Sequence, residues 1–388
     1  MRIGIIQRSD VRNVRALSGI PFFAARALEQ HVGEVVCIGP DDSLLTRALE
    51  KAGLALNRIS HALLKRRISA DHHRGLALRL ARVFSKRLRQ SGCDVLFAPN
   101  ASVEIAMLDT RIPIVYYSDL SWADIVDYYP YCTSLFGFAR EEAELIEASA
   151  MKRAAALIYP SPWAVKTAVE HYHIDPAMVH YIPCGANFDN EDVPSADLAL
   201  RHPLDGEIRL LWIGVDWDRK RGDIAFDCLR ELENWGVNAS LVICGCVPPA
   251  RFRHPRMEVI PFLNKHDAEQ RRKLSGLFLH ANFFLFPTMA EAYGIVLCEA
   301  SAHGLPSLVR NTGGVGGAIT DGENGYLMSP DAKGADYAAK VIELIRDPDK
   351  YERLVRSSRT AYEQRLNWDA WGRSVQPIFA QAVRTQTP

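Results

Sequence analysis

The chain has 388 residues, of which 48% are hydrophobic and 24% charged, with 46 Lys and Arg against 46 Asp and Glu. This length exceeds what a single hydrophobic core usually supports, so we expect two domains, and zero net charge gives no reason to expect nucleic acid as a partner. No apolar run is long enough to span a membrane, and the apolar part of the first ten residues is too short for a signal peptide.

The first half of the chain alternates short apolar runs with helical patterns, which favours a parallel sheet covered by helices. The polar, acidic segment 187–207 contains two prolines and is predicted to be a linker, which gives a first domain over 1–195 and a second over 205–371. A last helical pattern, 372–388, is assigned to the first domain. The strands expected in the first half are 2–6, 34–38, 95–98, 114–117, 156–159 and 179–182.

Segment 65–90 carries nine Lys or Arg against one acid, Asp71. Leu76, Leu80, Phe84 and Leu88 recur every four residues, which predicts a basic amphipathic helix. A solvated charged face is one interpretation. The other is peripheral contact with the anionic inner face of a membrane, because Lys and Arg near such a surface contribute about 1 kcal/mol each.

Cysteine and histidine usage gives no sign of a metal site. The eight cysteines are scattered and form no Cys-x-x-Cys or zinc spacing, so we expect reduced thiols, a cytoplasmic location and no bound metal. The histidine pairs at 72–73 and 171–173 lack matching carboxylates or cysteines and are expected at the surface.

The second half contains a β-α-β unit made by a strand at 283–286, a helix at 293–303 and a strand at 307–309. Its crossover is right-handed in nearly all proteins, which places loop 287–292 at the carboxyl end of the sheet, where open α/β folds bind ligands. Loops 214–222, 245–255 and 311–317 are expected at the same edge. The other strands expected here are 209–213, 240–244 and 258–260.

These loops contain the parts of an anion site. Gly294 opens the helix after the buried strand, so unpaired amides can face a phosphate. NTGGVGG (311–317) supplies four glycines that permit a close backbone approach, and Arg219 and Lys220 supply positive charge. Each feature alone also fits an ordinary turn or a solvated basic pair. Their convergence on one edge favours ligand binding.

Glu291 and Glu299 belong to the same segment, PTMAEAYGIVLCEASAHGLP. Glu299 lies among apolar residues, and a buried carboxylate needs a partner. Ionised carboxylates accept sugar hydroxyls well, so we expect Glu299 to hold a ribose rather than a protein cation. The alternative for Glu299 is an exposed or internally paired helix residue.

Segment 287–328 closely resembles the Glu-x7-Glu segment of the retaining GT-B glycosyltransferases of family 4. LLWIGVDWDRKRGDI (210–224) is similar to the phosphate loop of that family, VHYIPCGANFD (179–189) to the end of its first domain, and the final helical segment to its returning helix. The resemblance implies an α/β fold of two Rossmann-like domains facing across a cleft. It also implies a helix that returns to the first domain.

The resemblance implies a role for each matching position. Glu299 would bind the nucleotide ribose and Glu291 the hydroxyls of the transferred sugar. Lys220, with Arg219, would stabilise the diphosphate leaving group. The remaining donor-binding positions, which act largely through backbone groups, would be Gly214, Leu263, Ala292, Tyr293, Gly294, Ile295 and Val296. No cofactor or metal is implied beyond the nucleotide-diphosphate sugar, with a UDP- or GDP-sugar favoured.

Two positions depart from the pattern of the family. Val215 follows Gly214 where the family often has arginine, and Arg219 is the candidate substitute. The family commonly carries a histidine after the strand at 114–117, where this chain has Ser118 and Asp119. Asp119 is our candidate for orienting a sugar, with an N-cap or turn carboxylate as the alternative.

The first domain is expected to bind the acceptor. Ser18 and Gly19 fall in the loop after the first strand, where small residues let a substrate approach, although an ordinary helix cap explains them equally. Gly-x-Gly-x-x-Gly is absent from this turn, which argues against a nicotinamide site.

We therefore predict a retaining glycosyltransferase that moves a sugar from a nucleotide-diphosphate sugar to a hydroxyl acceptor, whether a glycan, a lipid-linked saccharide or a small molecule. The alternatives are a GT-B-like nucleotide-sugar epimerase or hydrolase, which needs no acceptor, and a non-catalytic partner subunit.

Overall fold

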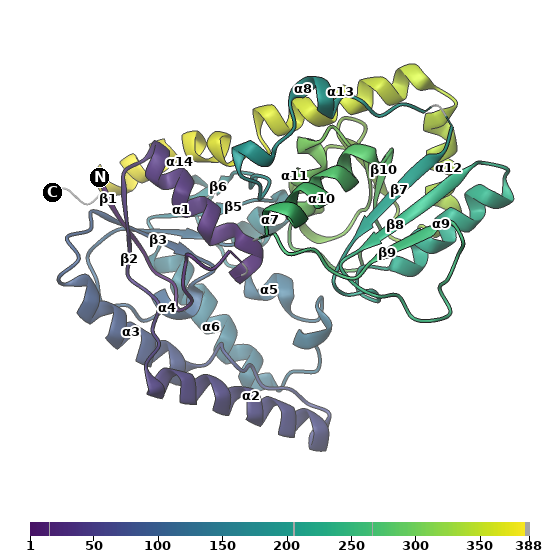
Figure 1. Ribbon diagram of the computed structural model, residues 1–388. Coiled ribbons are helices and arrows are strands. Elements are labelled where there is room, and N and C mark those ends of the chain that lie inside the picture. Colours follow the sequence, from purple (N-terminus) through teal and green to yellow (C-terminus); the bar gives the residue numbers. More distant parts are fainter. Residues whose placement is uncertain (15, 205, 266, 385–388) are drawn as a thin grey trace. The chain divides into compact units, whose positions relative to one another are not determined.

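The computed structural model describes residues 1–384 apart from residues 15, 205 and 266. The chain forms two compact units, one of Met1–Pro183 with Trp371–Pro388 and one of Cys184–Ala370 (Figure 1). Residues 385–388, at the end of the expected final helix, lie outside the described residues. Each unit is an α/β fold built on its own parallel sheet, as the alternating pattern of the sequence predicts.

The first unit contains a six-stranded sheet with the order β2-β1-β3-β4-β5-β6, in which all neighbours pair in parallel. Its strands are β1 (Arg2–Ile5), β2 (Glu34–Cys37), β3 (Val95–Pro99), β4 (Ile114–Tyr117), β5 (Ala156–Tyr159) and β6 (Val179–Tyr181). Its helices are α1 (Ile20–His31), α2 (Leu44–Leu64), α3 (Arg74–Leu88), α4 (Ser102–Ile105), α5 (Trp122–Ile125), α6 (Gly137–Arg153), α7 (Pro162–Glu170) and most of α14 (Trp368–Arg384).

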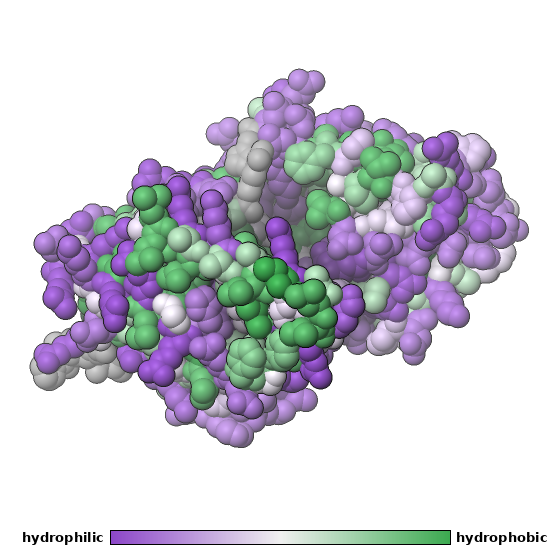
Figure 2. All heavy atoms as spheres, turned by 90° about the horizontal axis from the view of Figure 1, so that it is seen from below, coloured by the Kyte–Doolittle hydropathy of each residue, from purple (hydrophilic) through white to green (hydrophobic). Residues whose placement is uncertain are grey.

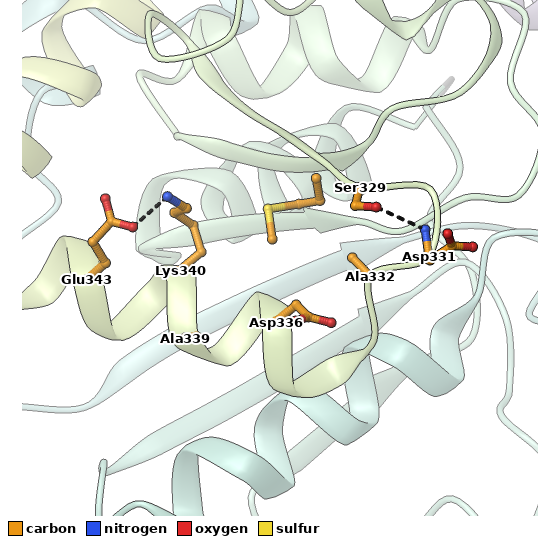
Figure 3. A pocket seen from close by; sticks show the side chains of 8 residues that line it. Ser329, Asp331, Ala332, Asp336, Ala339, Lys340 and Glu343 are labelled. Carbon is orange, nitrogen blue, oxygen red and sulfur yellow. Dashed lines mark hydrogen bonds and ion pairs between the residues drawn. The ribbon is translucent and has the colours of Figure 1, made fainter.

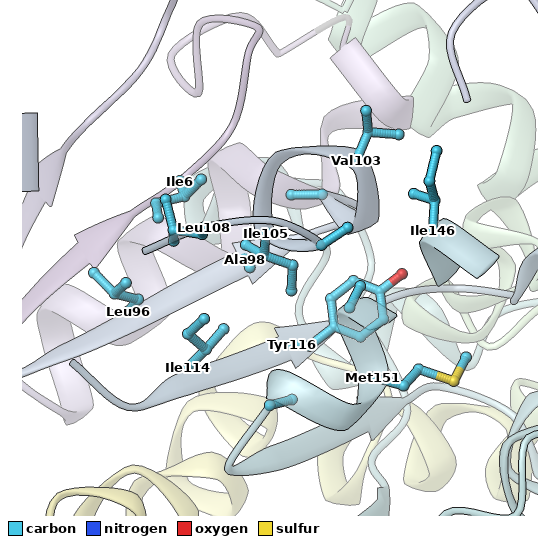
Figure 4. Close-up of a cluster of buried hydrophobic side chains, with 14 of the residues drawn as sticks. Ile6, Leu96, Ala98, Val103, Ile105, Leu108, Ile114, Tyr116, Ile146 and Met151 are labelled. Carbon is cyan, nitrogen blue, oxygen red and sulfur yellow. The ribbon is translucent and has the colours of Figure 1, made fainter. Parts of the chain in front are cut away.

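The core of the first unit lies between this sheet and the helices α3, α4 and α6. Figure 4 shows Leu96, Ala98, Ile114 and Tyr116 of the strands turned toward the side chains of the neighbouring helices. Burial of such apolar area contributes about 25 cal/mol per Å² and holds the layers together. The buried sheet brings the loops that follow β1, β3 and β4 to one edge.

The second unit contains a six-stranded sheet with the order β12-β11-β10-β7-β8-β9, again parallel throughout. Its strands are β7 (Ile208–Ile213), β8 (Ala239–Cys244), β9 (Met257–Ile260), β10 (Phe283–Phe286), β11 (Ser307–Arg310) and β12 (Gly325–Met328). Its helices are α8 (Ala196–Ala199), α9 (Gly222–Asn234), α10 (Ala268–His280), α11 (Ile295–Ala302), α12 (Gly334–Ile345) and α13 (Pro348–Gln364).

Segment 187–207, predicted to be a linker, belongs instead to the second unit. Asn187 accepts a hydrogen bond from the Trp368 indole at 2.8 Å, and Phe188 lies edge-on to Phe278. Asp192 pairs with Arg271 at 2.8 Å. A polar composition indicated an exposed connection, but hydrogen bonds and one aromatic side chain fix this segment to the unit that follows it.

The basic helix predicted over 65–90 is shorter than expected. The helix α3 begins at Arg74, where the side chain of His73 caps it, and ends at Leu88. Its leucine and phenylalanine stripe is buried in the core of the first unit. The periodicity therefore marks a core-facing helix, and only its charged side remains exposed.

Candidate active site

The strand order of the second unit creates a switch point between β7 and β10. From β7 the chain moves outward to β8 and β9, and it then returns to place β10 on the other side of β7. In open α/β sheets the crevice outside the carboxyl ends of two such strands is the usual ligand site. Loops 214–221 and 287–294 leave these two strands and meet there.

Lys220 and Glu291 contact each other across the switch point, since the ammonium of Lys220 donates to the carboxylate of Glu291. Arg219 Nη1 lies 3.7 Å from the same carboxylate and donates to the carbonyl of Ala290 at 2.8 Å. Burial lowers the pKa of Lys220, while Glu291 acts in the opposite direction. Two cations therefore share the Glu291 carboxylate, and Asp216 lies 3.7 Å from Arg219 Nε as a second carboxylate. Both cations are of the kind that binds an anionic ligand.

Small residues let the Lys220 side chain reach this position. A Cβ at Gly214 would lie 2.9 Å from the ring of Trp212 and 3.1 Å from Lys220 Cγ. Gly245, at the end of β8, has a φ of 112° and would bring a Cβ to 2.7 Å from the Gly214 carbonyl. Both positions therefore require glycine, since a side chain at either would push the two loops apart.

The helix α11 points its amino terminus at the same place. Gly294 precedes it with a φ of 92°, and no side chain caps the first turn. The amide of Gly314, in the glycine-rich segment, donates to the Glu291 carbonyl at 3.1 Å and holds loop 287–294 from the other side. The uncapped start of the helix thus lies close to the two cations, and such helix starts suit anions.

Glu299 has a protein partner, contrary to our expectation. The carboxylate is 2% exposed and accepts from the ammonium of Lys265, and a backbone amide bond from Asn187 also reaches it. Burial raises the pKa of Glu299, and Lys265 counteracts this effect.

His303 fixes the end of the helix that carries Glu299. Its Nδ1 donates to the Glu299 carbonyl at 2.8 Å, so its Nε2 accepts from the Ser275 hydroxyl at 2.8 Å. Burial lowers the pKa of His303 to about 4, which keeps the ring neutral, as these two bonds require. His303 is a supporting residue that the sequence did not single out.

The other predicted donor positions lie around the same loops. Ala292, Tyr293 and Gly294 are buried, while Ile295, Val296 and Leu263 are partly exposed. The phenol of Tyr293 donates to the Cys184 carbonyl at 3.1 Å, so its side chain serves packing within the unit.

The predicted residues of the first unit follow β1 and β4. Ser18 is exposed, Gly19 is buried, and both have positive φ just before α1. Asp119 accepts a hydrogen bond from Asn100 at 2.5 Å. Its carboxylate therefore bonds to the loop that follows β3 rather than capping a helix.

Sequence reasoning missed Arg8. Its guanidinium lies 3.4 Å from the buried carboxylate of Glu104 and 3.3 Å from the more exposed carboxylate of Asp71. Burial would lower the pKa of Arg8, but Glu104, Asp71 and Glu50 outweigh it and raise that pKa. The order β2-β1-β3 gives the first unit a switch point between β1 and β3, and this cluster occupies it.

A surface pocket of about 530 Å³ lies elsewhere in the second unit, between the end of β12 and α12. Figure 3 shows Lys340 bonded to Glu343 and Ser329 to Asp331 along its wall. None of the predicted donor residues lines it, and its one lysine, Lys340, pairs with Glu343. The chemistry points to the β7–β10 switch point rather than to this pocket.

Across the part of the chain that the structure describes, no group of three or more His, Cys, Asp or Glu side chains is arranged to hold a metal ion. Within the same residues, none of the helices combines the length and the apolar character needed to cross a membrane.

Comparisons with known proteins agree with this geometry. Residues 203–361 match the family Glycosyl transferases group 1, and residues 24–190 match Glycosyltransferase Family 4. HepE of Anabaena, solved in complex with UDP, superimposes with a TM-score of 0.66 at 15% identity over 98% of this chain and 100% of that one.

Two curated relatives align with part of the chain. A D-inositol 3-phosphate glycosyltransferase of Streptomyces bingchenggensis is 26% identical over 232 residues, which cover 56% of this chain and 50% of that protein. A glycogen synthase of Mycobacterium tuberculosis is 27% identical over 194 residues, which cover 48% and 45%. The alignments thus span about half the length of these relatives.

The structure has the GT-B fold, with two Rossmann-like units. The second half matches the group 1 glycosyltransferases and the first half Glycosyltransferase Family 4, and together these matches place the chain among the group 1 GT-B glycosyltransferases. The resemblance stated from the sequence is therefore confirmed.

Proposed function

We propose that the protein is a retaining glycosyltransferase that moves a sugar from a nucleotide-diphosphate sugar to a hydroxyl acceptor. The observation that carries the proposal is the pair of cations, Lys220 and Arg219, held on Glu291 at the β7–β10 switch point. The complex of HepE with UDP supports a nucleotide-diphosphate donor, since that protein has the same fold.

The diphosphate is the leaving group in this reaction, and its charge grows as the bond to the sugar breaks. Lys220, with Arg219 beside it, lies where it can neutralise that charge, and the free amides at the start of α11 add dipoles of the same sign. Preorganised groups of this kind accelerate reactions because they need no rearrangement at the transition state.

Glu291 is proposed to hold hydroxyls of the transferred sugar. Its carboxylate already accepts from Lys220, and an ionised carboxylate has about four acceptor sites, so capacity for sugar hydroxyls remains. When the diphosphate binds, Lys220 can exchange its carboxylate partner for phosphate oxygens. Glu291 is then available to the sugar at the moment the donor is in place.

Glu299 is proposed to accept from the ribose. Lys265 is the more mobile member of its ion pair, with 39% of the side chain exposed against 3% for Glu299. Movement of Lys265 would free one carboxylate oxygen for a ribose hydroxyl, while Asn187 keeps the carboxylate in position.

The acceptor is proposed to bind the first unit, near Ser18, Gly19 and Asp119. Asp119 is held in place by Asn100, and an oriented carboxylate can fix a sugar hydroxyl. The acceptor class stays open among glycans, lipid-linked saccharides and small molecules. A cytoplasmic location, and contact of the charged segment 65–90 with an anionic membrane, remain proposals of the same kind.

Nucleotide release from a panel of UDP-, GDP- and ADP-sugars, with and without a mixed acceptor panel, tests the function. We expect one donor class to be consumed, faster when an acceptor is present, and equally well with EDTA, because the proposed catalysis is metal-independent. Consumption that no acceptor accelerates would favour the hydrolase or epimerase alternative. Nucleotide binding without any consumption would favour a non-catalytic subunit.

A further inference from the structure

The helix α2 turns its apolar side chains outward. Seven large apolar residues on it are between 50% and 85% exposed: Leu44, Leu45, Leu54, Leu56, Ile59, Leu63 and Leu64. Most of them fall on one face, because Leu45, Leu56, Ile59 and Leu63 recur at the spacings of successive helical turns. An amphipathic helix of a soluble unit normally buries this face.

An adjoining face of α2, polar and small, is the one that packs. The Thr46 hydroxyl donates to Asp41 at 2.5 Å, and the Asn57 side chain accepts from the Ile68 amide at 3.2 Å. Gly53 is buried so closely that a Cβ there would lie 2.3 Å from the Ala70 carbonyl. The helix is thus fixed to the unit by hydrogen bonds and close backbone contact, and its apolar face stays exposed.

The apolar surface continues beyond the end of α2. The Arg67 amide donates to the Ser134 carbonyl at 2.8 Å, and the Phe136 amide donates to the Arg67 carbonyl at 2.9 Å. Phe138, 63% exposed, stacks on Phe136 with the ring centres 5.5 Å apart. Figure 2 shows hydrophobic side chains gathered in a band over this face of the first unit. Contiguous apolar patches of this kind mark interaction surfaces.

Positive charge lies on the side of the helix away from this apolar stripe. Arg47, Lys51 and Arg58 share a face, since their spacings are four and seven residues, and at 3.6 residues per turn this face is roughly 140° from that of Leu56 and Leu63. Lys65 and Arg66 follow at the end of the helix, and both are exposed. Of the two acids nearby, Glu50 faces Arg8 at 4.0 Å and Asp42 pairs with Arg47 at 2.8 Å.

We propose that α2 lies in the headgroup layer of an anionic bilayer, with its leucines turned toward the acyl chains and the basic face on lipid phosphates. Helices with one apolar face and a Lys/Arg-rich polar face bind in this way. A second copy of the chain fits less well, because it would supply no counter-charge to these cations: the one acid of α2, Glu50, faces Arg8. The inference goes beyond the proposed glycosyl transfer and does not depend on it.

This surface differs from segment 65–90, which the sequence indicated. The apolar stripe of α3 is buried, and Arg79 and Arg87 of that helix donate to Ser43 and to the Ile38 carbonyl within the unit. The lipid-facing apolar side chains belong to the preceding helix, α2, whose charge is not extreme.

Flotation of the full chain with vesicles tests the proposal. The vesicles are neutral phosphatidylcholine or phosphatidylcholine with 30 mol% phosphatidylglycerol, a fraction of about one lipid in three chosen to reach a strong negative surface potential. The variants are Leu56→Gln/Ile59→Gln/Leu63→Gln and Lys51→Glu/Arg58→Glu. Gln keeps helix propensity, and Leu198→Gln/Trp235→Gln removes exposed apolar side chains from the second unit as a matched control.

We expect the parent and the control to float with anionic vesicles, and each α2 variant to lose binding by about tenfold or more. Circular dichroism checks that the variants remain folded, and nucleotide release checks the donor site separately. No flotation of the parent overturns the proposal, as does equal loss in the control. A parent that sediments as a dimer and becomes a monomer in the leucine variant would also overturn it, because a second copy would then cover the face.

Discussion

The two units have related strand orders, β2-β1-β3-β4-β5-β6 and β12-β11-β10-β7-β8-β9, but differ in the charge at their switch points. In the second unit, the cations of Lys220 and Arg219 match the two carboxylates of Glu291 and Asp216. In the first unit, the single guanidinium of Arg8 lies among the carboxylates of Glu104, Asp71 and Glu50. A diphosphate suits the second unit and is repelled by the excess of carboxylates in the first. Each unit has a crevice at its switch point, and we expect side-chain charge to select the one that binds the donor.

The largest expected effect follows from removing the cation of the second unit. Lys220→Ala should lower kcat by about 10²- to 10³-fold, the usual cost of losing one preorganised group at a developing charge. Steady-state nucleotide release measures it. The matched control is Lys340→Ala, which breaks an ion pair with Glu343 outside the proposed site and should keep parental turnover. A Lys220 variant as active as this control would contradict the assignment.

The first unit provides the contrasting test. Arg8→Met leaves the carboxylate of Glu104, 2% exposed, without its cation, which should cost about 3 kcal/mol of unfolding free energy. Urea unfolding measures that loss. Nucleotide affinity, measured by calorimetry at a temperature where the variant is folded, should stay at the parental value. A large fall in nucleotide affinity would mean that the donor uses the first unit.

The sequence predicted most of the site residues in the second unit but missed the Arg8 cluster in the first. The buried strands predicted at 283–286 and 114–117 are present, because short continuous apolar runs are typical of strands buried on both faces. Lys220, Glu291 and Gly294 also meet as predicted, since all lie in short loops directly after or before such elements.

Partners that come from distant segments could not be predicted. Lys265 and Glu299 are 34 residues apart, and Arg8 and Glu104 are 96 apart, so no local pattern links them. The strand β12 and the exposed apolar face of α2 were also missed. Periodicity indicates that a helix has an apolar face but does not tell which way that face points.

The role of Glu299 can be separated from that of its ion pair by a double-mutant cycle. Glu299→Gln should weaken nucleotide binding about tenfold, because an amide retains one acceptor oxygen but no charge. Lys265→Met should not weaken it, since Lys265 competes with the ribose for the carboxylate. Calorimetry with UDP and GDP gives the affinities. If both single variants and the double variant bind equally weakly, Glu299 acts only through Lys265 and the ribose contact is wrong.

The smallest expected effect is a loss of stability caused by His303, which is absent at pH 7 and appears at acidic pH. The folded-state pKa of His303 is lowered to about 4, so the unfolded chain binds that proton first and stability falls as pH drops below about 6.5. This component should cost about 1 kcal/mol at pH 5.5 and disappear in His303→Gln. Burial also lowers the pKa of His202, so His202 adds a dependence of stability on pH with the same sign in the parent and in the variant. Urea unfolding at pH 7.5 and 5.5 measures the difference, and an unchanged slope in the variant would contradict the neutral buried ring.

The most direct test of the account is a crystal structure of the protein with UDP or GDP bound. The account predicts the diphosphate at the carboxyl ends of β7 and β10, with Lys220 and the first amides of α11 on its oxygens and Glu299 on the ribose. A nucleotide bound at the β1–β3 edge of the first unit, or in the pocket beside α12, would contradict it.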